Sequence, residues 1–211
     1  MAKVHPDGVA PAVPNPASLA LFPDVGGEAA AVLTVWKKSL LLNFEGFTVF
    51  DSKGDLVFRV DNYASSSRGV VVLMDATGEP LLTVRRKRLS LGERWLVYEG
   101  EGATRPRFSV KKHANMFQGK TLAQVTACAP GPEGCCAYEV EGSYSRRSCA
   151  VFDAARRGVA EITTKDSPGG VRFGGDVFRL VVQPGFDATV AMAIVVLLEQ
   201  MFGSGGSLIK G

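Results

Sequence analysis

The sequence is poor in the side chains and motifs on which most enzyme active sites depend. Its two histidines are His5, near the start, and His113, which we interpret as an exposed loop residue rather than a general base. The motifs G-x-S-x-G, H-E-x-x-H and G-x-x-x-x-G-K-[ST], which mark hydrolase nucleophiles, zinc peptidases and phosphate-binding loops, do not occur in it. We therefore predict a protein that is not an enzyme and uses no cofactor.

A strong excess of one charge is also missing. Lysine and arginine total 24 against 21 acidic residues, a formal net charge of +3, so the overall balance does not by itself indicate a nucleic-acid partner. Any site for an anion must therefore come from local clustering of basic residues.

Cysteines are few, and their spacing does not fit a metal site. Cys128, Cys135, Cys136 and Cys149 form no C-x-x-C pair, and two adjacent cysteines on a strand point to opposite faces of the sheet. Residues 1–20 are interrupted by four prolines and hold no apolar core of a secretory signal. We expect reduced thiols, no metal and a cytoplasmic protein that is not secreted, with the inner face of the plasma membrane and the nucleus as open alternatives.

One apolar run stands out, between residues 188 and 198, and it is shorter than the roughly 20 residues that a bilayer crossing requires. Asp187 fits a helix N-cap and Gly203 a C-terminal stop, so we predict a helix over 187–202. Because the run is apolar on every side, the helix is expected to be enclosed by the rest of the domain. Insertion into a membrane is the alternative.

The rest of the chain consists of short apolar-rich runs separated by turn residues, which is typical of an all-β domain. Two runs, 48–60 and 72–84, each hold an Asp-x-x-Gly turn between two strands, and 150–162 is a weaker repeat. The aspartates can accept hydrogen bonds from backbone amides, and Gly54 and Gly78 can adopt the positive φ that such loops need. Each repeat therefore predicts a β-hairpin.

Further strand candidates show the same pattern, and together with the hairpin arms they amount to about a dozen strands, within the size range of closed sheets. We therefore predict a mainly β fold in which the sheet encloses the helix. Residues 1–27 are expected to be a flexible leader, 28–203 the folded domain and 204–211 a flexible tail. The further strand candidates are 32–36, 94–99, 107–110, 122–125, 136–141 and 177–182.

Several stretches in order along the chain carry a resemblance to a known family. They are LTVWKKSL at 33–40, FTVFDSKGDLVFRVDNY at 47–63, DATGEPLLTVRRKR at 75–88, WLVYEG at 95–100, and DVFRLVVQPGFD at 176–187 with the apolar helix after it. Together they resemble LURP-one-related proteins of plants over most of residues 28–203.

The resemblance implies a tubby-like fold, a β-barrel of about twelve strands around a central apolar C-terminal helix, related also to phospholipid scramblases. It further implies a role in plant defence-related signalling, and, by way of tubby proteins, binding of phosphoinositide headgroups at the inner membrane leaflet.

A scramblase-like protein that acts on membrane lipids is the alternative function. Scramblases carry a cluster of acidic residues before the C-terminal helix that suits calcium, whereas the matching stretch here has only Asp176 and Asp187, far apart in the chain. Calcium binding needs several convergent oxygens, so a calcium-driven activity is not expected.

Local clustering of basic residues is sharpest at 85–88, at the end of a predicted strand, and further basic pairs occur at 37–38 and 111–112. Side chains alternate along a strand, so two of the four residues at 85–88 can lie on one face and hold a phosphate, or form a solvated rim of a barrel. The binding interpretation gains strength if the fold brings the pairs to the same rim. The candidate residues for an anionic headgroup are Arg85, Arg86, Lys87, Arg88, Lys37, Lys38, Lys111 and Lys112.

The expected partners are anionic phospholipid headgroups at the inner leaflet or, as an open alternative, another protein. Two further basic pairs, Arg146-Arg147 and Arg156-Arg157, fall in predicted turns, and we interpret both as surface charge.

Overall fold

The computed structural model describes residues 29–38, 46–61, 69–87, 92–113, 120–128, 136–165 and 174–203. The expected leader and tail lie outside these ranges. The described residues form twelve strands and one helix, namely β1 (Ala31–Trp36), β2 (Gly46–Phe50), β3 (Leu56–Asp61), β4 (Val70–Asp75), β5 (Pro80–Arg86), β6 (Arg94–Glu99), β7 (Phe108–Lys112), β8 (Thr121–Ala127), β9 (Cys136–Ser143), β10 (Ser148–Asp153), β11 (Gly158–Thr164), β12 (Val177–Val182) and α1 (Ala188–Phe202).

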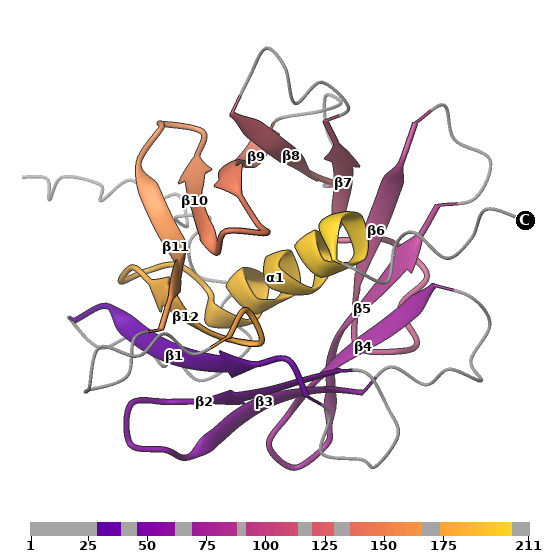
Figure 1. Ribbon diagram of the computed structural model, residues 1–211. Helices are drawn as coiled ribbons and strands as arrows, with labels where there is room; N and C mark the ends of the chain where they lie inside the picture. The colour runs from indigo at the N-terminus through magenta and orange to yellow at the C-terminus, as the bar shows by residue number, and fades with distance from the viewer. Residues whose placement is uncertain are drawn as a thin grey trace, which may run out of the picture.

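The strands form a closed antiparallel barrel around the helix (Figure 1). Each strand pairs with its neighbours in the sequence, and β12 pairs with β1 to close the sheet. Because closure leaves no unpaired edge, every strand has two partners for its backbone groups. The mainly β fold predicted from the sequence is confirmed.

Alternation along the strands fills the inside of the barrel with apolar side chains. On β1, Leu33 and Val35 are buried, and their partners on β12, Leu180 and Phe178, are buried too. Every second residue points inward, so the residues between them, such as Trp36, point outward. The same alternation, which we call the parity of a residue on its strand, decides which member of each basic pair faces the core.

Helix α1 lies inside the barrel, as its composition predicts (Figure 1). The side chain of Asp187 caps it by accepting a hydrogen bond from the backbone N–H of Thr189 at 2.8 Å. All residues from Ala188 to Leu198 are buried, which satisfies a helix that is apolar on every side. In the described part of the chain, no helix is both long and apolar enough to cross a membrane.

Three hairpins share one turn design. Asp51, Asp75 and Asp153 each end or follow a strand, and one carboxylate oxygen of each accepts hydrogen bonds from backbone N–H groups two and four residues on, at 2.8 to 2.9 Å. Gly78 has φ +95°, as expected for this position, whereas the third hairpin places Arg156 there with φ +62°. An arginine in a left-handed conformation explains why the sequence of the third repeat is weaker.

The barrel has two distinct ends. Odd-numbered strands all run in one direction, because every neighbouring pair is antiparallel. The three Asp turns lie at the end where odd-numbered strands begin, which we call the hairpin rim. At the other end, the helix-exit rim, odd-numbered strands finish and α1 ends: Lys37, just after β1, contacts Glu199 of the helix.

Candidate functional site at the helix-exit rim

The predicted basic clusters converge at one end of the barrel. Residues 37–38 follow β1, residues 85–87 are at the end of β5, and residues 111–112 end β7. Since these three strands run in the same direction, all three clusters lie at the helix-exit rim. Arg88 lies outside the described residues.

The inward members of the clusters, Lys37, Arg86 and Lys112, have the parity of the buried residues on their strands. Lys37 Nζ lies 2.8 Å from Glu199 Oε1. Arg86 Nη2 and Lys112 Nζ each lie 2.8 Å from a different carboxylate oxygen of Glu93. All three cations therefore have carboxylate partners, although the side chains of Arg86 and Glu93 are 53% and 42% exposed, and the two carboxylates offset only part of the three positive charges.

Lys112 also stabilises the end of the helix. Its Nζ donates a hydrogen bond to the carbonyl oxygen of Met201 at 2.9 Å and lies 4.9 Å from the centre of the Phe202 ring. The last turn of α1 contains no basic residue of its own. A cation from β7 thus offsets the partial negative charge that the helix C-terminus carries.

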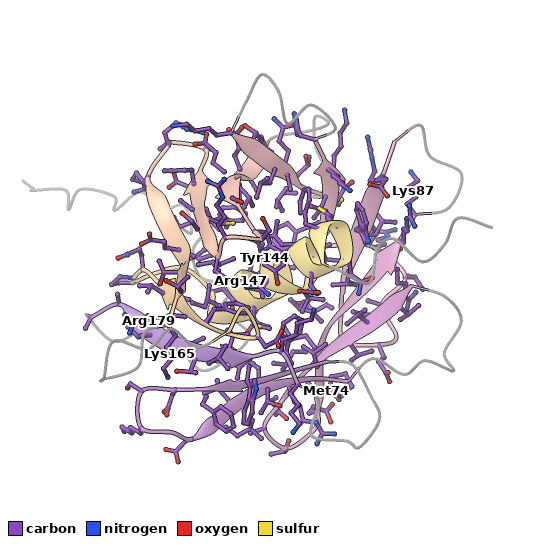
Figure 2. All side chains as sticks on the ribbon, viewed as in Figure 1. Met74, Lys87, Tyr144, Arg147, Lys165 and Arg179 are labelled. Atoms are coloured by element: carbon purple, nitrogen blue, oxygen red, sulfur yellow. The ribbon has the colours of Figure 1, made fainter. Side chains whose placement is uncertain are left out.

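The outward members, Lys38, Lys87 and Lys111, are exposed to solvent. Within the described residues, their Nζ atoms have no hydrogen-bond or ion-pair partner, although Lys38 Nζ lies 5.6 Å from the centre of the Trp36 ring. Figure 2 shows Lys87 at the outer edge of the barrel. Parity therefore divides the predicted site into an inward half whose cations have carboxylate partners and an outward half whose lysines face solvent without one.

Arg85 has outward parity but does not join the outward lysines. Its guanidinium carbon lies 4.7 Å from the centre of the Tyr98 ring, and its Nη2 donates to the carbonyl oxygen of Glu101 at 3.0 Å. Tyr98 pairs with Thr83, and Glu101 lies in the turn after β6, so the side chain runs back along the barrel wall toward the hairpin rim. Arg85 is thus not in position to grip a phosphate together with Lys87.

A buried cluster that the sequence analysis missed lies beneath the same rim. Glu199, whose side chain is only 13% exposed, accepts a hydrogen bond from the hydroxyl of Tyr144 at 3.0 Å, and Arg147 Nη2 lies 3.9 Å from it. The pKa of the Tyr144 hydroxyl is raised, mainly by burial, so the phenol stays protonated. The available sequence signal was a carboxylate at the end of an all-apolar helix, which needs polar partners once the helix is enclosed.

The interpretation of the pair Arg146-Arg147 as surface charge is wrong for Arg147. It is only 9% exposed, and its guanidinium carbon lies 4.2 Å from the centre of the Tyr144 ring and 4.3 Å from that of Phe178. Its Nε donates to the carbonyl oxygen of Gly175 at 2.9 Å, whereas its Nη1 is buried without a partner. Figure 2 shows Tyr144 and Arg147 together beside α1. Arg146, the preceding residue, is exposed as expected.

His113 also differs from expectation, because it is half-buried at the end of β7 and its Nε2 is buried without a hydrogen-bond partner. Cys128 and Cys136 are exposed, and Cys149 is buried; Cys135 lies outside the described residues. No group of three or more His, Cys, Asp or Glu side chains gathers in the described residues in a way that could hold a metal ion.

The two rims differ in charge. Among the described residues, the helix-exit rim has few acidic residues, at positions 61, 93, 176 and 199, and two of these, Glu93 and Glu199, are paired with inward cations. The hairpin rim has more acidic residues, interspersed with Lys53, Arg105 and other cations. Its acidic residues are Asp51, Asp55, Asp75, Glu79, Glu99, Glu101, Asp153 and Asp187. Exposed positive charge without nearby carboxylates is therefore concentrated at the helix-exit rim.

Three comparisons with known proteins agree with this architecture. A family model described as LURP-one-related matches residues 31–199. Protein LURP-one-related 8 of Arabidopsis thaliana is 49% identical over 181 residues, which cover 84% of this chain and 90% of that protein. Protein LURP-one-related 17 of the same plant is 42% identical, covering 85% of this chain and 86% of the relative. An X-ray structure of another A. thaliana protein shares the fold with a TM-score of 0.60 and 24% identity, over 82% of this chain and 91% of that one.

Proposed function

Because this chain belongs to the LURP-one-related family, in which the names of the relatives indicate no enzymatic activity, we propose that it is a non-enzymatic binding protein. Its partner is an anionic membrane surface, such as the cytoplasmic leaflet, with phosphoinositides among the headgroups. The observation that carries the proposal is the convergence of the basic residues of β1, β5 and β7 at one rim, with Lys38, Lys87 and Lys111 exposed.

The spacing of these lysines favours a charged surface over a single bound phosphate. Neighbouring strands lie about 4.8 Å apart, so Lys87 and Lys111, two strands apart, are separated by about 10 Å along the sheet. Lys38 and Lys87, four strands apart, are separated by about 19 Å along it. Lysine is a flexible point charge, and such an arrangement suits several separate headgroups.

The strength of docking follows from the number of exposed cations. Near an anionic leaflet each exposed lysine contributes about 1 kcal/mol, so three contribute about 3 kcal/mol, which gives weak and reversible recruitment. Because the lysines are exposed, the attraction is screened by salt. The inward cations add less than the outward ones, since Glu93 and Glu199 offset part of their charge.

Sedimentation with phosphatidylcholine vesicles that contain phosphatidylinositol 4,5-bisphosphate tests the proposal, at low and at physiological salt. The Lys87→Ala/Lys111→Ala variant is expected to bind about 30-fold more weakly, which corresponds to about 2 kcal/mol. A control variant, Lys53→Ala/Arg105→Ala, removes the same charge from the hairpin rim and is expected to bind like the unmodified protein.

Two results would overturn the proposal: no sedimentation of the unmodified protein at low salt, or equal losses in the two variants. In the first case the next partner to test is a protein with an acidic surface. Vesicles in which phosphatidylserine supplies the same charge distinguish a reader of phosphoinositides from a reader of surface charge.

Lipid flipping, the alternative from the sequence, requires α1 to leave the barrel. The helix is buried along nearly its whole length. Asp187 caps its N-terminus, and Lys37 and Lys112 bind Glu199 and the Met201 carbonyl near its C-terminus. No feature of the described residues favours this alternative.

A further inference from the structure

The outer wall of the barrel beside β1 carries exposed apolar side chains. Among the described residues, the large hydrophobic side chains that are exposed are Val32, at 39%, and Trp36, at 44%. Both have outward parity on β1, and Trp36 is its last residue, at the helix-exit rim. An exposed tryptophan beside exposed lysines is unusual, because this side chain has a large apolar surface that is normally buried.

Apolar and hydroxyl side chains surround Trp36 on the outward face. Its partners across the sheet are Val177 on β12 and Thr48 on β2. Thr48 is buried, and its hydroxyl donates to the carbonyl oxygen of Lys38 at 2.7 Å, which ties the end of β1 to the neighbouring strand. The indole therefore projects from a firmly held part of the sheet.

Cations flank this part of the wall. Lys38 Nζ lies 5.6 Å from the centre of the Trp36 ring. Lys165, which follows β11, donates from its Nζ to the hydroxyl of Thr34 at 2.8 Å, and the exposed Arg179 of β12 pairs in register with the same Thr34. Figure 2 shows Lys165 and Arg179 on the same side of the barrel.

Acidic residues are sparse on the same face. On the outward face of β1, β12 and β11, Glu161 is the acidic residue, and it pairs with Val181 in the half of the wall away from the helix-exit rim. Asp176 lies just before β12 and is exposed. The cations beside Trp36 thus outnumber the carboxylates, and the charge of the face complements an anionic partner.

We propose that Trp36 is an interfacial membrane anchor, whose indole enters the headgroup region of an anionic bilayer while Lys38, Lys165 and Arg179 contact lipid phosphates. Indole has an apolar body and one N–H donor, and tryptophan therefore favours the boundary between water and lipid. The proposal rests on the membrane docking proposed above and adds a tilt to it: the helix-exit rim meets the bilayer inclined toward β1 and β12, so that Trp36 enters the headgroup region while Lys87 and Lys111, on the other side of the rim, stay at the membrane surface.

The chain provides its own fluorescent probe for this contact. It contains two tryptophans, and the other one, Trp95, is only 2% exposed inside the barrel. A Trp95→Phe variant leaves Trp36 as the fluorophore. Comparing the unmodified protein with a Trp36→Phe variant isolates the same signal without altering the core.

The Trp95→Phe variant, the unmodified protein and the Trp36→Phe variant are each mixed with vesicles that contain phosphatidylinositol 4,5-bisphosphate and phosphatidylcholine. The phosphatidylcholine is used with or without bromine on the upper part of its acyl chain. Sedimentation is measured on the same samples. The emission of Trp36 is expected to shift to shorter wavelength and to be quenched by the brominated lipid. Trp36→Ala is expected to weaken binding about tenfold, because roughly half of the surface that Trp36 exposes in the free protein leaves water when the protein binds the membrane. Val32→Ala, the control at the far end of β1, is expected to bind like the unmodified protein.

Vesicle binding without quenching, or with equal affinity of Trp36→Ala and Val32→Ala, would overturn the anchor and leave the proposed function intact. Absence of sedimentation would instead overturn both.

Discussion

Replacing Arg147 by alanine is expected to lower the free energy of unfolding by about 3 kcal/mol, although its sequence context suggests an ordinary surface residue. The guanidinium loses contacts with two rings, at 4.2 and 4.3 Å, each contributing about 1 to 2 kcal/mol at a desolvated site. It also loses the hydrogen bond to Gly175, which contributes about 1.5 to 3 kcal/mol because the donor is charged. Removing the unpartnered Nη1 returns about 1 to 3 kcal/mol, which leaves a net loss near 3 kcal/mol.

Urea unfolding followed by circular dichroism measures this loss. For a chain of this length the free energy falls by about 3 kcal/mol for each molar unit of urea, so the midpoint is expected to move down by about 1 M. The matched control is Arg146→Ala, which removes the same charge one residue earlier from an exposed position. It is expected to change the stability by less than about 0.5 kcal/mol.

Equal midpoints for the two variants would refute the reasoning, because they would mean that the stacked guanidinium contributes no more than a solvated one. An Arg147→Lys variant separates charge from shape. It keeps the cation but loses the planar group that stacks on Tyr144 and Phe178, so it is expected to fall between the unmodified protein and the alanine variant.

Two further predictions follow from burial. Val195→Asp places an unpaired carboxylate in the helix at a fully buried site and should abolish soluble expression, whereas Val32→Asp, at an exposed site on β1, should express normally; equal yields would contradict an enclosed helix. Burial raises the pKa of the Cys149 thiol to about 11, so iodoacetamide at pH 8 should modify the exposed Cys128 and Cys136 well before Cys149, as read by peptide mass spectrometry, and comparable rates would contradict its burial.

The secondary structure followed from local patterns. The turns at Asp51 and Asp75 contain within five residues all the groups that close them, so their hairpins can be recognised without knowledge of the rest of the fold. The same holds for α1, whose N-cap is Asp187 and whose uniformly apolar surface requires enclosure. These features depend on neighbours in the chain, which is why the sequence predicts them.

The candidate site, in contrast to the secondary structure, could be predicted only in part from the sequence. The basic clusters were visible in the sequence, and their convergence could be stated only as a condition, because it depends on the common direction of β1, β5 and β7. Alternation predicts that adjacent cations point to opposite faces, but not which of them meets a carboxylate. Glu199 meets Lys37 only because the fold brings the end of the helix beside the end of β1, and Glu93 meets Arg86 and Lys112 across the neighbouring strands β5, β6 and β7.

By itself, then, the sequence determined the strands, the three hairpins, the enclosed helix and the family resemblance, all of which depend on order and spacing along the chain. Only the tertiary structure decided that Arg147 is buried while Arg146 is exposed, and that Trp36 lies on the outer wall beside Lys38. The physical reason is that burial and pairing at these positions depend on contacts across the barrel, between residues that no local pattern connects.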